Sequence, residues 1–107
     1  MDNREGRGVV YDKVGNVLFE GEFFEDRIHG FGTSYHSVGQ KEYEGEWFRD
    51  KSHGLGKSYD DRGKIQYYGY YKNDKRCGEG IGYYPNGFKK YEGNFLGFCK
   101  LYRDLEE

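Results

Sequence analysis

Apolar and polar residues alternate along several short stretches of the chain. The clearest stretch is residues 43–47, Tyr-Glu-Gly-Glu-Trp, in which the aromatic residues and the glycine share one side and the glutamates share the other. A period of two residues predicts a half-buried β-strand. Residues 19–23 follow the same pattern, and residues 91–95 follow it less regularly. Residues 67–71 have aromatic residues on both sides, which predicts a strand that is buried on both faces.

The same positions recur along the chain with a step of 24 residues. Three positions in the first half of the pattern occur four times each: Phe19, Tyr43, Tyr67 and Tyr91; Gly21, Gly45, Gly69 and Gly93; Phe23, Trp47, Tyr71 and Phe95. Four positions in the second half keep the same step and start at Gly6, Gly8, Tyr11 and Gly15. A constant period of this length indicates an array of tandem repeats.

Each repeat predicts two strands joined by a loop such as residues 24–28, and a turn such as residues 36–39 leads to the next repeat. Connections this short join antiparallel neighbours. The expected fold is therefore all-β: an elongated, single-layer antiparallel β-meander of tandem hairpins, with about eight strands. Glycine ends each turn, which suits a positive φ. Glycine within a strand suits close approach of another group, so we expect a ring from the neighbouring strand to lie over it.

The pattern divides a single domain into parts. We expect a half repeat at residues 5–17, full repeats at residues 18–41, 42–65 and 66–89, and a partial repeat at residues 90–98. Beyond it, apolar residues fall at helical spacing, which predicts a short helix over residues 99–107 that caps the open edge of the sheet. These apolar residues are Phe98, Leu101, Tyr102 and Leu105. A frayed tail or a tag remnant is the alternative for this segment.

The pattern also resembles a known family. Residues 43–47 are followed by residues 53–56, His-Gly-Leu-Gly, and then by Tyr59 and Gly63, an order that is similar to the MORN repeat. The resemblance covers roughly residues 5–98. It implies a scaffold in a cytoskeletal, ciliary or membrane-contact assembly, in which some members bind a partner helix in a groove. It also implies two other roles. One is a membrane adaptor, since some members are linked to acidic lipids. The other is a regulatory appendage of an enzyme, since similar repeats accompany lipid kinases and a lysine methyltransferase.

Composition alone favours disorder, because 35% of the residues are hydrophobic and 34% are charged. The aromatic content of 20% reverses that expectation, since each aromatic side chain can bury roughly 150–250 Å². The chain has no apolar run of the length of a transmembrane helix, and its first residues do not resemble a signal peptide. We therefore expect a cytoplasmic protein, with cytoskeletal, ciliary or membrane association as the resemblance implies.

Cys77 and Cys99 occupy the same kind of loop in neighbouring repeats. Two free thiols are the expected state, because disulfides are rare in reducing compartments and the spacing matches no metal-binding motif. A disulfide or a metal pair is the alternative, because the repeat brings the two loops near each other.

No catalytic arrangement stands out, so we expect no enzyme, no cofactor and no metal site. His29 and His53 occupy the same repeat position, and we expect both to pack or form hydrogen bonds within the loop, whereas His36 is expected in a solvated turn. The glycine-rich stretches at residues 6–8 and 78–82 lack the following helix that a phosphate-binding loop needs. Nucleic-acid binding is not expected, because the aromatic residues already serve the repeat and the formal net charge is −2.

The aromatic side of the sheet is the predicted functional surface. A single-layer sheet has no second layer to cover this side, and exposed apolar surface rimmed by charge marks a partner site. The expected function is a non-catalytic scaffold or assembly subunit that holds a partner helix or peptide there. The alternative is that these rings serve only as the core. The predicted partner-binding residues are Phe19, Phe23, Tyr43, Trp47, Tyr67, Tyr71, Tyr91 and Phe95.

An adaptor for acidic phospholipid membranes is the alternative function. Residues 1–47 have five Lys/Arg against ten Asp/Glu, whereas residues 48–107 have twelve against nine. Each basic residue near an anionic membrane contributes about 1 kcal/mol, so this mild excess predicts weak, salt-sensitive binding. The predicted contacts are Lys72, Lys75, Arg76, Lys89 and Lys90.

Overall fold

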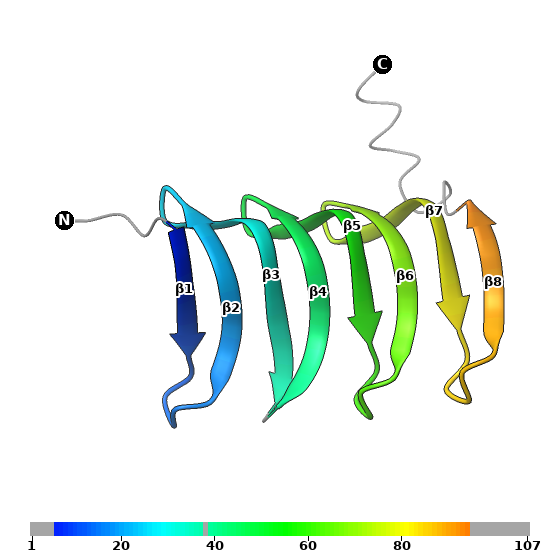
Figure 1. Ribbon diagram of the computed structural model, residues 1–107, viewed down its shortest axis with the longest axis horizontal. Coiled ribbons are helices and arrows are strands. Elements are labelled where there is room, and N and C mark those ends of the chain that lie inside the picture. Colours follow the sequence, from blue (N-terminus) through cyan, green and yellow to red (C-terminus); the bar gives the residue numbers. More distant parts are fainter. Residues whose placement is uncertain (1–5, 38, 95–107) are drawn as a thin grey trace, which may run out of the picture.

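The computed structural model describes residues 6–37 and 39–94, which form one eight-stranded antiparallel sheet with the strands in chain order (Figure 1). The strands are β1 (Gly6–Tyr11), β2 (Val17–Phe24), β3 (Arg27–Ser37), β4 (Gln40–Phe48), β5 (Lys51–Tyr59), β6 (Ile65–Lys72), β7 (Lys75–Tyr83) and β8 (Lys89–Asn94). This arrangement confirms the predicted all-β meander of hairpins. The predicted cap at residues 99–107 lies outside the described residues.

One glycine from each strand lies in a single row that crosses the whole sheet. The register pairs Gly8 with Gly21, Gly21 with Gly32, and so on to Gly80 with Gly93. We call this set the glycine row, and it comprises Gly8, Gly21, Gly32, Gly45, Gly56, Gly69, Gly80 and Gly93. The row leaves a band of bare backbone across the middle of the sheet.

Aromatic rings lie over this bare band, as the sequence predicts. A Cβ atom on Gly32, Gly56 or Gly80 would overlap a ring of the preceding strand. The rings are those of Phe19, Tyr43 and Tyr67, respectively. The two tyrosines also donate hydrogen bonds from their hydroxyls to backbone carbonyls three residues on, at 2.8 Å to Glu46 O and 2.9 Å to Tyr70 O. The ring and the glycine therefore require each other.

The rings also contact one another edge to face, in a zigzag along one face of the sheet. Neighbouring ring centroids are 5.0 to 5.5 Å apart, and the ring planes cross at 86° to 89°. This T-shaped arrangement is one that aromatic pairs prefer. In order along the sheet, the rings are Phe23, Phe19, Trp47, Tyr43, Tyr71 and Tyr67. We call this face the aromatic face, and it holds the buried core.

The turns inside each repeat are tighter than the sequence predicts. Two residues, Asn73 and Asp74, connect β6 to β7, and both have positive φ, at 50° and 71°. The pairs Glu25-Asp26 and Arg49-Asp50 behave in the same way. Positive φ at both positions of a two-residue loop is the mark of a type I′ hairpin turn, and asparagine and aspartate tolerate it better than most residues.

The turn aspartates also link each hairpin to the one before it. Asp50 Oδ1 accepts a hydrogen bond from Ile28 N at 2.7 Å. Asp74 Oδ1 accepts two, from Ser52 N at 2.8 Å and Ser52 Oγ at 3.0 Å. Ser52 is buried. These side chains therefore hold neighbouring repeats in register along one edge of the sheet.

The turns between repeats end in glycine with positive φ, which confirms that prediction. The φ values of Gly15, Gly39, Gly63 and Gly87 are 97°, 73°, 85° and 94°. An Asp or Asn side chain caps three of these turns, as where Asp60 Oδ1 accepts hydrogen bonds from Arg62 N and Lys64 N. These bonds favour the charged form and lower the pKa of Asp60.

Gly56→Ala is expected to destabilise the fold, because its methyl group would overlap the Tyr43 ring. Overpacking of this kind costs roughly 1–3 kcal/mol or more in the free energy of unfolding, which urea denaturation would measure. Gly8→Ala is the matched control, since its Cβ would lie 3.3 Å from the Phe23 ring. Equal losses in the two variants would contradict the proposed role of the ring over the glycine.

Asp74→Gly is expected to cost about 1–3 kcal/mol, because it leaves the buried amide of Ser52 without its side-chain acceptor. Glycine tolerates the positive φ, so the loss would not come from backbone strain. Glu25→Gly is the matched control, because it places glycine at an exposed, positive-φ position of the equivalent turn between β2 and β3. Equilibrium unfolding of both variants should show a loss only at Asp74; no loss there would exclude the link between hairpins.

Candidate functional site

The structure places five of the eight predicted partner-binding rings in the core. Phe19, Phe23, Tyr43, Tyr67 and Tyr71 are 0% to 9% exposed, so they have little surface for a partner. Trp47 is half-buried and donates a hydrogen bond from Nε1 to Gly32 O at 3.1 Å. Tyr91 is 48% exposed, and Phe95 lies outside the described residues. Partner binding on this face stays a prediction, with Trp47 and Tyr91 as its accessible residues.

The buried tyrosines are neutral, and two of them, Tyr43 and Tyr67, donate hydrogen bonds from their hydroxyls. Burial raises the pKa of Tyr43 and Tyr71 above the ordinary value, and it raises the pKa of Tyr67 to about 12. The Arg76 guanidinium beside Tyr71 lowers the Tyr71 pKa, but by less than burial raises it. Arg76 also lies over the Tyr67 ring, 4.7 Å from its centroid. These phenols therefore remain protonated at neutral pH.

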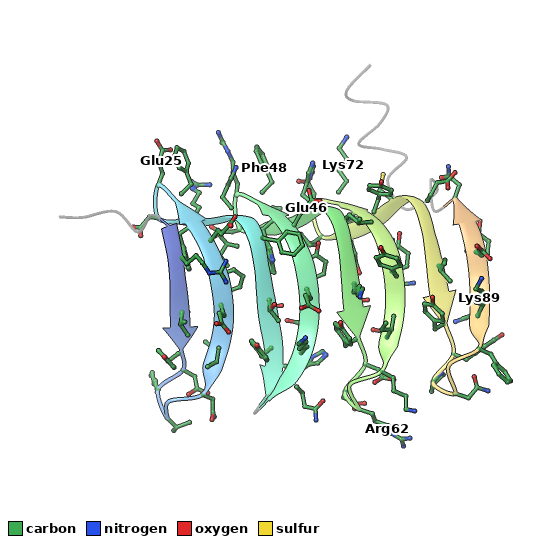
Figure 2. All side chains as sticks on the ribbon, in the orientation of Figure 1. Glu25, Glu46, Phe48, Arg62, Lys72 and Lys89 are labelled. Atoms are coloured by element: carbon green, nitrogen blue, oxygen red, sulfur yellow. The ribbon has the colours of Figure 1, made fainter. Side chains whose placement is uncertain are left out.

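The five cations of the predicted lipid site do not form one cluster. Lys72 and Lys75 face each other beside the β6–β7 turn, whereas Arg76 stacks on a core ring. Lys89 and Lys90 begin β8, toward the opposite edge of the sheet, and Figure 2 shows Lys72 and Lys89 well apart. Lys89 pairs with Glu92 at 3.1 Å. Lys75 and Lys89 are thus near in sequence but lie at opposite edges of the sheet, because β7 crosses the sheet between them.

Cys77 is disulfide-bonded, which corrects the prediction of a free thiol. A disulfide needs Cα atoms roughly 4.4–6.8 Å apart, and Cys77 lies near the start of β7, beside the β6–β7 turn. The chain has one other cysteine, Cys99, which lies outside the described residues. The argument for a reducing compartment therefore loses its support from the cysteines.

The histidines pack against aromatic rings or bridge repeats. The His29 ring lies between Phe24 and Phe48, at centroid distances of 5.9 and 5.1 Å, and the His53 ring lies 5.5 Å from Phe48. His36 is exposed, and its Nε2 lies 3.1 Å from Tyr59 O in the next repeat. Within residues 6–37 and 39–94, His, Cys, Asp and Glu side chains form no cluster of three that could hold a metal.

The face opposite the aromatic face has two rows of side chains that flank the glycine row, because successive residues of a strand point to opposite faces. The first row is Val9, Glu20, Thr33, Glu44, Lys57, Tyr68, Ile81 and Glu92. The second row is Arg7, Glu22, Phe31, Glu46, Leu55, Tyr70, Glu79 and Asn94. We call this the outer face; no other described element lies against it.

The third repeat differs from its neighbours on the outer face. β2 and β4 each place two glutamates there, whereas β6 places Tyr68 and Tyr70. These tyrosines are 39% and 49% exposed, which corrects the prediction that β6 is buried on both faces. The register sets Tyr70 beside Leu55 and Tyr68 beside Ile81. We call Leu55, Tyr68, Tyr70 and Ile81 the outer patch.

Two shallow hollows adjoin the outer patch, and the glycine row forms part of their lining. One, of about 290 Å³, extends over β4 and β5 and is lined by Phe31, Leu55 and Tyr68 together with Gly45 and Gly56. The other, of about 350 Å³, extends over β6 and β7 and is lined by Tyr70 and Ile81 together with Gly69, Gly80 and Gly93. Leu55 and Tyr68 line both hollows. Four carboxylates and one lysine complete the lining: Glu44, Glu46, Glu79, Glu92 and Lys57.

The charged groups near the outer patch are partly engaged by neighbours. Glu44 accepts hydrogen bonds from Tyr59 Oη at 2.9 Å and from Lys41 Nζ, and these contacts lower its pKa against the effect of burial. Burial and the Glu44 carboxylate together raise the pKa of Tyr59 to about 12. Lys57 Nζ lies 5.5 Å from the centroid of the Tyr68 ring. The lining of the hollows is therefore acidic with an apolar centre.

Sequence reasoning missed the outer patch, although a signal for it is present. The repeated aromatic and glycine positions predicted the aromatic face alone as the functional surface. The useful signal was on the other side, where the third repeat breaks the glutamate pattern at residues 68 and 70. In a repeat protein, such a departure at an exposed position marks surface that the fold does not need.

These observations define the class: a β-repeat protein of stacked hairpins with a ring-on-glycine core. The family model of the MORN repeat matches residues 19–41, 43–64 and 67–89, so the chain belongs to the MORN-repeat family. MORN repeats are interaction modules, associated in general with protein or membrane binding, and do not define an enzyme family. A search of curated proteins found no match. In the described part of the chain, no helix has the length and apolarity to cross a membrane.

Alkaline pH is expected to destabilise the fold. Tyr59 and Tyr67 have a pKa of about 12 when folded and about 10 when unfolded, so between these values the folded state holds protons that the unfolded state has lost. The free energy of unfolding should therefore be level up to about pH 9 and fall between about pH 10 and 12. Urea denaturation across this range, with tyrosinate absorbance as a second signal, would measure the slope.

Tyr67→Phe and Tyr59→Phe should each reduce this slope, because each removes one proton that the folded state retains. Glu44→Gln should reduce it less than Tyr59→Phe, since burial remains the larger cause of the raised Tyr59 pKa. A free energy of unfolding that stays level to pH 12 in the unmodified protein would exclude the protonated tyrosine core.

Proposed function

We propose that this chain is a non-catalytic protein-interaction module that holds a segment of a partner polypeptide on the outer patch. The observation that supports it is the exposure of Tyr68 and Tyr70, beside half-buried Leu55 and Ile81, on a sheet face that no other described element covers. Tyrosine is favoured at interfaces because it supplies a large contact area with few rotatable bonds. Contiguous apolar surface rimmed by charge is typical of partner sites.

The polypeptide reading is favoured over the membrane adaptor by the distribution of charge. The outer patch lies among carboxylates, which an acidic membrane would repel. The five cations predicted for lipid contact lie along both edges of the sheet and on the aromatic face. Exposed Phe48 lies at the edge with Lys72 (Figure 2), but the aspartates of the type I′ turns share that edge.

Site-specific photo-crosslinking in the cells that make the protein would test the proposed function. A photoreactive phenylalanine at position 70 should cross-link to a polypeptide, whereas the same residue at position 14 should not, since Val14 is 81% exposed in the β1–β2 turn. The partner identified by this cross-link, once purified, should then bind the Tyr70→Glu variant at least about tenfold more weakly than it binds the unmodified chain.

Three outcomes would overturn this proposal. Cross-links from position 47 or 91, with none from position 70, would place the partner on the aromatic face. Equal affinity for Tyr70→Glu would exclude the outer patch. Sedimentation with acidic vesicles that Tyr70→Glu abolishes, in the absence of any protein cross-link, would make the ligand a membrane.

A further inference from the structure

We infer that the outer patch takes a cationic amphipathic helix that lies across the strands. This inference rests on the proposed function and adds the chemistry and shape of the partner segment. Three features support it: the spacing of the two hollows, the charge of their lining and the restriction of the apolar side chains to one part of the array.

The spacing of the hollows suits a helix. One hollow extends over β4 and β5 and the other over β6 and β7, so their centres lie two strand steps apart. Strands lie about 4.8 Å apart, which makes this separation close to 10 Å. Two side chains seven residues apart on an α-helix are separated by about the same distance along its axis. An extended segment laid in the same direction would place every third residue at this spacing, and so would turn alternate anchors away from the sheet.

The charge of the lining selects a cationic helix. Glu44 and Glu46 line the first hollow, Glu79 and Glu92 line the second, and Lys57 is the one cation that lines either. A helix with Lys or Arg next to each apolar anchor would pair these carboxylates as the anchors enter. An acidic or neutral helix would leave them near an apolar surface without counter-charge, which opposes binding.

The third repeat fixes where the helix binds along the array. In the first repeat, Glu22 Oε1 accepts a hydrogen bond from Phe31 N at 2.9 Å, so its carboxylate lies against the facing strand. Tyr70 holds the same position in the third repeat, and an exposed phenol ring replaces that carboxylate. The apolar anchors of the helix therefore find their complement at β5 to β7 and not one repeat earlier.

A binding measurement with designed peptides would test the inference. The probe is a fluorescently labelled synthetic helix of leucine and lysine, about four turns long, with leucines at positions i, i+3, i+4 and i+7. The comparison peptides have glutamate in place of every lysine, or the same leucines and lysines in strict alternation. Fluorescence polarisation should show binding of the leucine–lysine helix, and at least about tenfold weaker binding of both other peptides.

Two protein variants separate the contributions of shape and charge. Tyr70→Glu adds a negative charge, so it should weaken binding by about tenfold or more if the apolar anchor matters, whereas a purely electrostatic contact would become stronger. The double variant Glu46→Gln, Glu79→Gln should weaken binding several-fold and reduce its dependence on salt. Val14→Glu, far from the outer patch, is the matched charge control. Circular dichroism of each variant should show the unmodified fold, since the first two repeats have glutamate at the positions equivalent to 70, Glu22 and Glu46.

The backbone amide signals of the sheet would locate the bound helix. Chemical-shift changes should gather at Leu55, Tyr68, Tyr70 and Ile81. Changes confined to the aromatic face, stronger binding by Tyr70→Glu or equal binding of the glutamate peptide would overturn the inference. A cross-link from position 70 to a polypeptide without binding of the leucine–lysine helix would overturn the partner chemistry and leave the proposed function intact.

Discussion

The contact between an aromatic ring and a strand glycine is the constraint on which the rest of this structure depends. The Tyr67 ring can lie over β7 only because Gly80 has no side chain there. The ring in turn covers the backbone at Gly80, which has no side chain of its own to pack. The T-shaped contacts alternate between two rings of one strand and rings of neighbouring repeats, so they join each repeat to the next. A single sheet can thus build a core on one face with very few aliphatic residues, and each hairpin depends on its neighbours for stability.

The parts of the fold that follow from this contact were predictable from the sequence. The step of 24 residues predicted the strand order, the meander and the ring over the glycine, since each depends on a position that repeats. The type I′ turns were not predicted, although Asp26, Asp50 and Asp74 keep the same step. Their role becomes clear only from their positive φ and from the bond that reaches the preceding hairpin.

The candidate site was less predictable, for two physical reasons. Sequence pattern separates two faces of a strand but does not say how far rings on one face cover each other, so buried Tyr43 and Tyr67 were predicted as partner contacts. Proximity in sequence also exaggerated the basic cluster, because the chain reverses between Lys75 and Lys89. The state of Cys77 was also not fixed by the sequence, because the repeat pattern allowed a disulfide but did not require one.

A core confined to one face separates the residues that the fold requires from those that are free to change. On the aromatic face the rings of Phe19, Tyr43 and Tyr67 each lie over a glycine of the next strand, so a substitution there disturbs two strands. On the outer face the same position accepts glutamate in β4 and tyrosine in β6 without any change in strand pairing. An array of near-identical repeats can therefore mark one location along its length by exposed side chains alone. For this reason an outer-face substitution in the third repeat separates binding from folding, which no substitution in the ring-and-glycine core can do.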